Sequence, residues 1–172
     1  MSILTKKEIL KELKTGSISI EPFDRSMIGP GSIDLHLGDK FRIFKKVAGI
    51  VEVNNTTDYE QMTELIHAPD GIILMPGETI LGITVEKIKL SPNICGWLEG
   101  RSRFARLGLL VHISASFMHP GINNNQVLEM TNFSPMPLRI CPGTAICQFI
   151  FQRTIGEAFY SGRFKNQKND DF

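Results

Sequence analysis

The sequence predicts an all-β fold, a sandwich or barrel that carries a helix at its N-terminus and short decorating helices. Three observations predict it: many short apolar segments, frequent Gly and Pro punctuation between them, and one clear helical pattern. The chain has 172 residues, a usual size for one domain with an adequate core. We therefore expect a single domain over residues 1–172.

The N-terminal helix is expected at about residues 5–15. Thr5 and Glu8 have the spacing of a capping box, in which two side chains bond the first free N–H groups of a helix. Apolar residues follow at helical spacing, and Gly16 is a suitable end because glycine readily adopts the left-handed conformation.

Strand patterns follow the helix. Ile33, Leu35 and Leu37 alternate with polar residues, which is typical of a strand with one face in water. Two later segments, ILMPGETILGITV (73–85) and RICPGTAICQFIF (139–151), each place a Pro-Gly turn between apolar runs. We expect each of them to form a β-hairpin.

Two segments lack a strand pattern. Residues 54–64 are polar, and we expect an excursion or a short helix there. The tail from 161 to 172 is polar and charged without periodicity, which, taken alone, is typical of a frayed terminus.

Composition bounds the partners and the compartment. The formal charge is +1 with basic and acidic residues nearly balanced, which argues against nucleic-acid binding over a broad basic face. The three cysteines, Cys95, Cys141 and Cys147, lie in apolar segments, and we expect reduced core thiols. The sequence shows no apolar run of membrane-spanning length and no signal pattern, so we expect a soluble, cytoplasmic protein that binds no membrane.

The segment 100–129 carries the chemistry. It opens with a Gly-Arg-Ser turn and contains a second arginine, Arg106. These groups suit a phosphate chain, because arginine matches phosphate oxygens and glycine lets backbone N–H groups come close. The segment ends on Glu129, a lone carboxylate in an apolar run, and burial suits a carboxylate to proton transfer. The pattern predicts an enzyme that acts on a phosphorylated small molecule.

The chain lacks the sequence motifs of a zinc deaminase. Zinc deaminases need a His-x-Glu and a Pro-Cys-x-x-Cys sequence to hold the metal and move protons. No histidine here is followed two places later by glutamate, and no Cys-x-x-Cys occurs. We therefore expect no zinc and no direct protein ligand to a metal.

The longer pattern resembles the dCTP deaminase family, which is related to the trimeric dUTPases and includes bifunctional deaminase–dUTPases. The resemblance is carried by WLEGRSRFARLGLLVHISA, followed by PG and VLE, and upstream by GSIDLHLGDKFRIF. It continues in PG(x)4Q from Pro142 to Gln148 and in the tail RFKNQ from Arg163 to Gln167. It implies a distorted jelly-roll β-barrel of the dUTPase-like type that forms homotrimers, with sites between subunits.

The resemblance also implies catalytic roles. Glu129 would shuttle protons while water attacks C4 of cytosine, and Ser102 and Arg106 would help to place that water. The backbone carbonyl of Ala115 would meet the water or the amine. The nucleotide contacts that the resemblance implies are Arg101, Ser102, Arg103, Phe117, Gln148, Arg163, Phe164 and Gln167.

Further expectations concern the tail, the metal and three polar residues. The resemblance implies that the tail 161–172 folds over the triphosphate and base, with Mg²⁺ bound to the triphosphate. Asp34 either orients water around Mg²⁺ or bonds across the barrel, and we favour the structural role. Gln148 contacts the nucleotide or a neighbouring strand, with equal weight. His112 is expected to be a core histidine with satisfied hydrogen bonds.

Departures from the family bear on the reaction. Arg103 replaces a small serine, and His119 replaces an aspartate that in dUTPases activates the water that cleaves the phosphate chain. The aromatic Phe117 is in the style of the bifunctional enzymes. The run from 122 to 126, INNNQ, replaces an aromatic-x-Gly turn.

These features lead to a main expectation and two alternatives. We expect hydrolytic deamination of dCTP to dUTP and ammonia, because Glu129 is present and the aspartate is absent. The first alternative is a bifunctional enzyme or dUTPase that releases dUMP and pyrophosphate. The second is a nucleotide-binding sensor without catalysis, and dUTP and dTTP are further candidate ligands.

Overall fold

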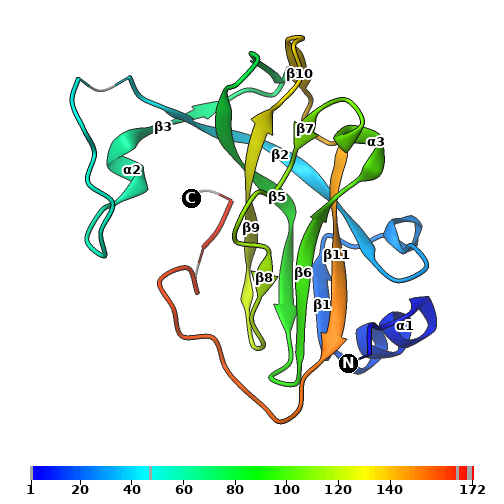
Figure 1. Ribbon diagram of the computed structural model, residues 1–172. Coiled ribbons are helices and arrows are strands. Elements are labelled where there is room, and N and C mark those ends of the chain that lie inside the picture. Colours follow the sequence, from blue (N-terminus) through cyan, green and yellow to red (C-terminus); the bar gives the residue numbers. More distant parts are fainter. Residues whose placement is uncertain (1, 47, 166, 170–171) are drawn as a thin grey trace.

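The computed structural model describes residues 2–46, 48–165, 167–169 and 172. A sheet of nine strands curls into an open barrel around the core (Figure 1). The predicted all-β fold with an N-terminal helix is confirmed. The helical elements are α1 (Lys6–Thr15), the 3-10 turn η1 (Arg25–Met27), α2 (Tyr59–Met62) and α3 (Ser102–Ala105).

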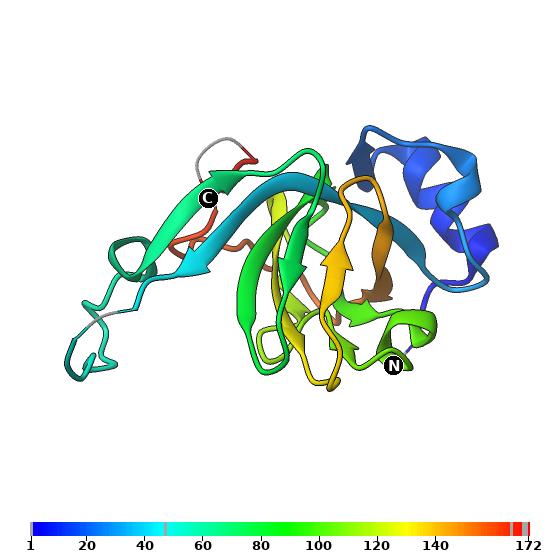
Figure 2. The same cartoon turned by 90° about the horizontal axis from the view of Figure 1, so that it is seen from above.

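The strands follow in the order β1 (Ile18–Glu21), β2 (Ile33–Phe44), β3 (Thr63–His67), β4 (Ile72–Leu74), β5 (Thr79–Leu90), β6 (Ile94–Gly100), β7 (Leu109–Leu110), β8 (Phe117–Met118), β9 (Asn123–Asn132), β10 (Leu138–Ile140) and β11 (Ala145–Arg153). The sheet has the order β7-β9-β5-β2-β11-β6-β8, with β1 on β5 and β3 on β2. α1 and the excursion that precedes α2 lie at opposite ends of the molecule (Figure 2).

α1 begins and ends where the sequence predicts, but its start differs in detail. Gly16 has φ 76° and its N–H donates to Leu13 O, as expected of a glycine that ends a helix. Thr5 occupies the cap position, yet its side chain makes no capping hydrogen bond, so the predicted capping box is wrong. The Lys6 N–H instead donates to the carbonyl oxygen of Pro30 at 2.8 Å, because the loop before β2 lies against the helix start.

The predicted strand around Ile33 is confirmed and lies at the centre of the core. Ile33, Leu35 and Leu37 on β2 are fully buried, while the residues between them are partly exposed. β2 pairs with β11, β3 and β5 along its length. The polar excursion contains the short helix α2, as predicted.

The two Pro-Gly segments turn where predicted, but neither forms a hairpin. β4 pairs with β10, with Leu74 opposite Leu138 and Ile72 opposite Ile140. The longer strands after the turns are occupied on both edges, since β5 lies between β9 and β2 and β11 between β2 and β6. The short strands before the turns therefore pair with each other, and the hairpin prediction is wrong.

The cysteines divide by position. Cys95 and Cys147 are buried, and burial raises the pKa of both thiols above its usual value. Cys141 is exposed, which corrects the expectation of a third core thiol. It follows the short strand β10 directly, before the Pro142-Gly143 turn. Within the described ranges, no helix has the length and apolar character needed to cross a membrane.

A close approach of β6 and β11 gives a stability prediction. A Cβ placed on Gly96 would lie 2.2 Å from Ile150 O and 2.2 Å from the buried ring of Phe149. Gly96→Ala is therefore expected to lower the free energy of unfolding by about 1–3 kcal/mol or more, because the core cannot absorb the added volume. Urea unfolding at one fixed protein concentration measures it. In the control Gly31→Ala, where the nearest atom lies at 3.8 Å, the midpoint should stay near that of the parent, and equal midpoints for both variants would refute the packing argument.

Candidate active site

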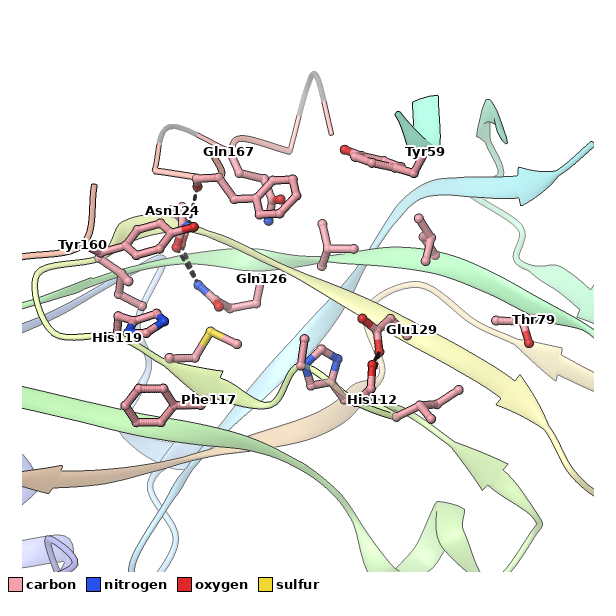
Figure 3. Close-up of a pocket in the computed structure, with 18 of the residues that line it drawn as sticks. Tyr59, Thr79, His112, Phe117, His119, Asn124, Gln126, Glu129, Tyr160 and Gln167 are labelled. Atoms are coloured by element: carbon pink, nitrogen blue, oxygen red, sulfur yellow. Dashed lines mark hydrogen bonds between the residues drawn. The ribbon is translucent and has the colours of Figure 1, made fainter. Parts of the chain in front are cut away.

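A cavity of about 670 Å³ opens between β9, the segment 112–119 and the C-terminal tail (Figure 3). This volume is in the range of pockets that hold small molecules the size of a nucleotide. Its lining residues are Phe44, Tyr59, Thr79, Leu81, His112, Ile113, Ser114, Ala115, Phe117, Met118, His119, Ile122, Asn124, Gln126, Val127, Glu129, Tyr160, Phe164 and Gln167.

Glu129 reaches the cavity because β9 alternates. Its neighbours Leu128 and Met130 are fully buried in the core, so Glu129 projects to the other face. Ser114 holds it there: the backbone N–H and the hydroxyl of Ser114 both donate to Glu129 Oε2 at 3.1 Å. Two donors to one oxygen fix the carboxylate and leave the other oxygen without a protein partner among the described residues. Ser114 was not singled out in the sequence analysis.

The segment that supplies Ser114 contributes further groups. Ala115, predicted to present its carbonyl, lines the cavity. His112 also lines it, but both of its ring nitrogens are buried without a hydrogen-bond partner among the described residues. The expectation of a satisfied core histidine is therefore wrong. A buried polar group normally has a hydrogen-bond partner, and a molecule bound in the cavity could supply one to His112.

Aromatic rings form one end of the cavity. The His119 ring is stacked on the ring of Tyr160 at 5.2 Å between centroids with 9° between planes. Phe117 meets His119 edge-on at 4.8 Å, and Trp97 on β6 packs against Phe117 at 5.9 Å. The predicted Phe117 thus lines the cavity, and His119 stands there as part of an aromatic stack without a carboxylate (Figure 3).

The C-terminal tail covers the cavity, which contradicts a frayed terminus for its described part. Gln167 forms two hydrogen bonds with the backbone of Asn125. Its side-chain Nε2 donates to Asn125 O at 2.8 Å, and its backbone carbonyl accepts from Asn125 N at 3.2 Å. Arg163 forms an ion pair with Asp58 at 2.7 Å. The Phe164 ring lies 6.3 Å from that of Tyr59, so the excursion before β3 and the tail hold each other.

The last described residue strengthens this attachment. Phe172 is 1% exposed, and its carbonyl oxygen accepts a hydrogen bond from Arg42 Nε. The guanidinium of Arg42 also lies 5.9 Å from the centroid of the Phe172 ring. The tail is therefore docked at its end as well as over the cavity.

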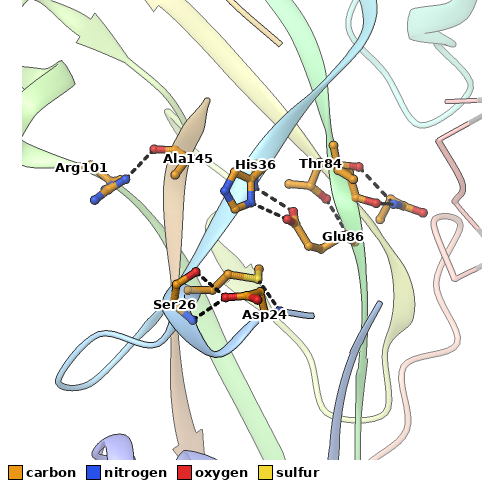
Figure 4. Close-up of polar contacts among 10 residues, drawn as sticks. Asp24, Ser26, His36, Thr84, Glu86, Arg101 and Ala145 are labelled. Carbon is orange, nitrogen blue, oxygen red and sulfur yellow. Dashed lines mark hydrogen bonds and ion pairs between the residues drawn. The ribbon is translucent and has the colours of Figure 1, made fainter. Parts of the chain in front are cut away.

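Within one chain, the residues predicted to bind the phosphates do not line this cavity. Ser102, Arg103 and Arg106 lie on or next to α3, are exposed, and do not line the cavity that holds Glu129. Arg101 forms an ion pair with Asp34 at 3.0 Å. Its guanidinium also donates to Ala145 O at 2.8 Å (Figure 4). A single chain thus carries two separate sets of predicted residues.

Asp34 and Gln148 have partners within the chain. Asp34 is the carboxylate of the Arg101 ion pair, a structural contact within the chain. Gln148 accepts a hydrogen bond from the Ser32 hydroxyl at 2.9 Å, which is the structural bond that the sequence analysis weighed against a nucleotide contact. The described residues contain no group of three or more His, Cys, Asp and Glu side chains placed to hold a metal ion.

Comparison with known proteins gives a consistent result. Residues 3–154 match the family described as dCTP deaminase-like. A "dCTP deaminase, dUMP-forming" from Salinispora tropica is 33% identical over 175 residues, 96% of this chain and 91% of the relative. One from a Nocardioides species is 35% identical over 176 residues, with the same coverage of both chains. A crystal structure of 2'-deoxycytidine 5'-triphosphate deaminase from Agrobacterium tumefaciens has the same fold, with a TM-score of 0.68, 18% identity, and coverage of 88% of this chain and 48% of that one.

Proposed function

The chain belongs to the dCTP deaminase-like family of hydrolases, and on that premise we propose that it converts dCTP to dUMP, ammonia and pyrophosphate. Two water molecules are consumed, one at C4 of the base and one at the phosphate chain. The relatives at 33–35% identity, which carry the name dUMP-forming, support this product. They favour the bifunctional alternative over the dUTP product expected from the sequence.

The placement of Glu129 is the observation that carries the deamination step. Glu129 takes a proton from water as the water oxygen bonds to C4, and passes that proton to N3. The remaining proton of that water, now on the C4 hydroxyl, then passes through Glu129 to the amine, which leaves as ammonia when the C4–N bond breaks and C4=O forms. Ser114 holds one carboxylate oxygen with two hydrogen bonds, so the other is free for these transfers.

We propose a homotrimer in which neighbouring chains complete the site. Ser102, Arg103 and Arg106 are exposed and away from the Glu129 cavity of their own chain, which supports their use by a neighbour. Arg101 and Ser102 of one chain would bind the triphosphate whose base lies against Glu129 of another. The tail residues Arg163, Phe164 and Gln167 would close over the same nucleotide.

Mg²⁺ would arrive with the triphosphate, because Mg²⁺ is usually bound by substrate phosphates, waters and one or two carboxylates. Asp34 fits a water-mediated contact to it, since only its Oδ2 is used by Arg101 and its side chain is partly exposed. When bound, the ion neutralises phosphate charge. Arg101 and Ser102 would orient the phosphates around it, in a cytoplasmic enzyme of nucleotide metabolism.

A second candidate is supported by His119. The family's aspartate is absent at this position, and the imidazole is stacked on Tyr160 instead of presenting a carboxylate. If no other group activates water at the phosphate chain, the product is dUTP and ammonia.

Incubation with dCTP and Mg²⁺, followed by separation of ammonia, dUTP and dUMP, tests these proposals. We expect ammonia and dUMP in equal amounts. Ammonia with dUTP would replace the first candidate by the second. Nucleotide binding without any product would contradict both and support a sensor, and a parallel incubation with dUTP isolates the cleavage step.

A further inference from the structure

A buried amide on β9 faces the cavity. Gln126 is 3% exposed and lines the cavity on the same strand as Glu129. Its side-chain Nε2 donates to Asn124 O at 3.1 Å and to Asn124 Oδ1 at 2.9 Å, and its backbone N–H donates to Thr84 Oγ1 at 2.9 Å. Both N–H bonds of the side-chain amide are used and the backbone N–H is bonded as well, so hydrogen bonds hold the residue at its amide and at its backbone.

The acceptors determine which way the amides point. Asn124 Nδ2 donates to the carbonyl oxygen of Phe164 at 2.8 Å, and a carbonyl can only accept, so Asn124 Oδ1 is the atom that faces Gln126. The second partner of Gln126 is also a backbone carbonyl. A flipped Gln126 amide would place its oxygen against two oxygens. The nitrogen therefore faces Asn124 and the oxygen is left for the cavity (Figure 3).

Gln126 Oε1 has no hydrogen-bond partner among the described residues. An amide oxygen only accepts, so it attracts an N–H group of a ligand and repels a carbonyl oxygen. Cytosine carries an amino group on C4, where uracil and thymine carry an oxygen. A fixed acceptor in the base pocket therefore distinguishes these bases by one atom.

The spacing along β9 places this acceptor near the reacting carbon. Glu129 is three residues from Gln126, about 10 Å along the strand. The alternation of β9 is interrupted between these two residues, because its pairing with β5 shifts register between Asn125 and Val127, and both side chains line the cavity. The two side chains reach into the cavity from either end of this interval, which leaves room for one edge of a pyrimidine ring. The edge that contains C4 can then meet both groups.

We propose that Gln126 is a specificity-determining residue that binds the 4-amino group of the pyrimidine, and that docking of the tail holds it in position through Asn124. The inference rests on the proposed function, because it assumes that the cavity takes the base of dCTP. It adds a residue that selects the amino form, and it gives the run NNNQ a role in connecting tail and base.

Gln126→Met tests the proposal, because methionine has a similar size without the acceptor. The measurements are kcat/KM for ammonia release from dCTP, and the inhibition constant of the α,β-imido analogue of dUTP, both with Mg²⁺. We expect kcat/KM for dCTP to fall about tenfold or more. The analogue should bind as before or more tightly, because its 4-oxygen no longer faces an acceptor.

Two further variants complete the design. Gln152→Met changes a buried glutamine on β11 that does not line the cavity and should leave both constants unchanged. Asn124→Leu removes the connection to Phe164 and should lower the discrimination in the same direction by a smaller factor. This second variant keeps the test available if Gln126→Met does not fold.

The outcomes separate the inference from the proposed function. If Gln126→Met weakened turnover of dCTP and binding of the dUTP analogue by the same factor, Gln126 would serve only for packing. If neither Gln126→Met nor Asn124→Leu changed the preference for dCTP over the analogue, Gln126 would not distinguish the bases. Either result overturns the inference. If the parent protein releases no ammonia from dCTP, the proposed function fails and the inference fails with it.

Discussion

Glu129→Gln is expected to lower the rate of ammonia release from dCTP by about 10²–10⁴-fold while nucleotide binding is retained. The amide keeps the size of the carboxylate and can still meet Ser114, but it cannot take the proton from water or deliver it to N3 and the amine. Stopped assays for ammonia give the rate, and calorimetry with the imido analogue of dUTP gives the affinity.

Glu64→Gln is the matched control for this prediction. Glu64 lies exposed on β3, away from the cavity, so its replacement makes the same change of charge without touching the site. Its rate should equal that of the parent protein. If Glu129→Gln and Glu64→Gln were equally active, Glu129 would not be the proton shuttle.

Mixing two inactive variants is expected to restore activity. Ser102→Ala alone should lose about 10²-fold or more, because a positioned donor at the reacting groups is removed. Glu129→Gln alone is inactive for the reason given above. When both chains are co-expressed, about one quarter of the sites in a random homotrimer would combine an intact Ser102 with an intact Glu129 from the neighbour.

This result follows from the geometry of one chain. Ser102 is exposed on α3 and does not line the cavity that holds Glu129. Ammonia release by the doubly tagged, co-purified mixture measures the recovery, and each variant purified alone is the control. A mixture no more active than its parts would contradict the shared site.

The sequence predicts the local elements of this fold better than their pairing. The alternation of Ile33, Leu35 and Leu37 predicts β2 because one face of a strand must be buried. The two Pro-Gly turns are also real, but pairing partners depend on which strand edges are free in the whole sheet. β5 and β11 are flanked on both sides, so β4 pairs with β10, and no local pattern indicates this.

The candidate site was predictable where a residue's chemistry is unusual for its surroundings. Glu129 stands out as a lone carboxylate in an apolar run, and the structure places it in the cavity. Ser114 carries no such signal, because a serine in a loop is common and its contact with Glu129 arises only from folding. The run NNNQ was the one available signal for Asn124 and Gln126, since consecutive amides are rare in a buried strand.

Incorporation of ¹⁸O from labelled water reports directly on the attack of water at C4 that Glu129 assists. Products formed from dCTP in H₂¹⁸O are separated, and the mass of their uracil base is measured by mass spectrometry. The Glu129→Gln protein is assayed in parallel. We expect one ¹⁸O at the 4-position of uracil in every product molecule, and loss of this product in the variant. An unlabelled 4-oxygen, or equal labelling rates for parent and variant, would contradict water attack at C4 assisted by Glu129.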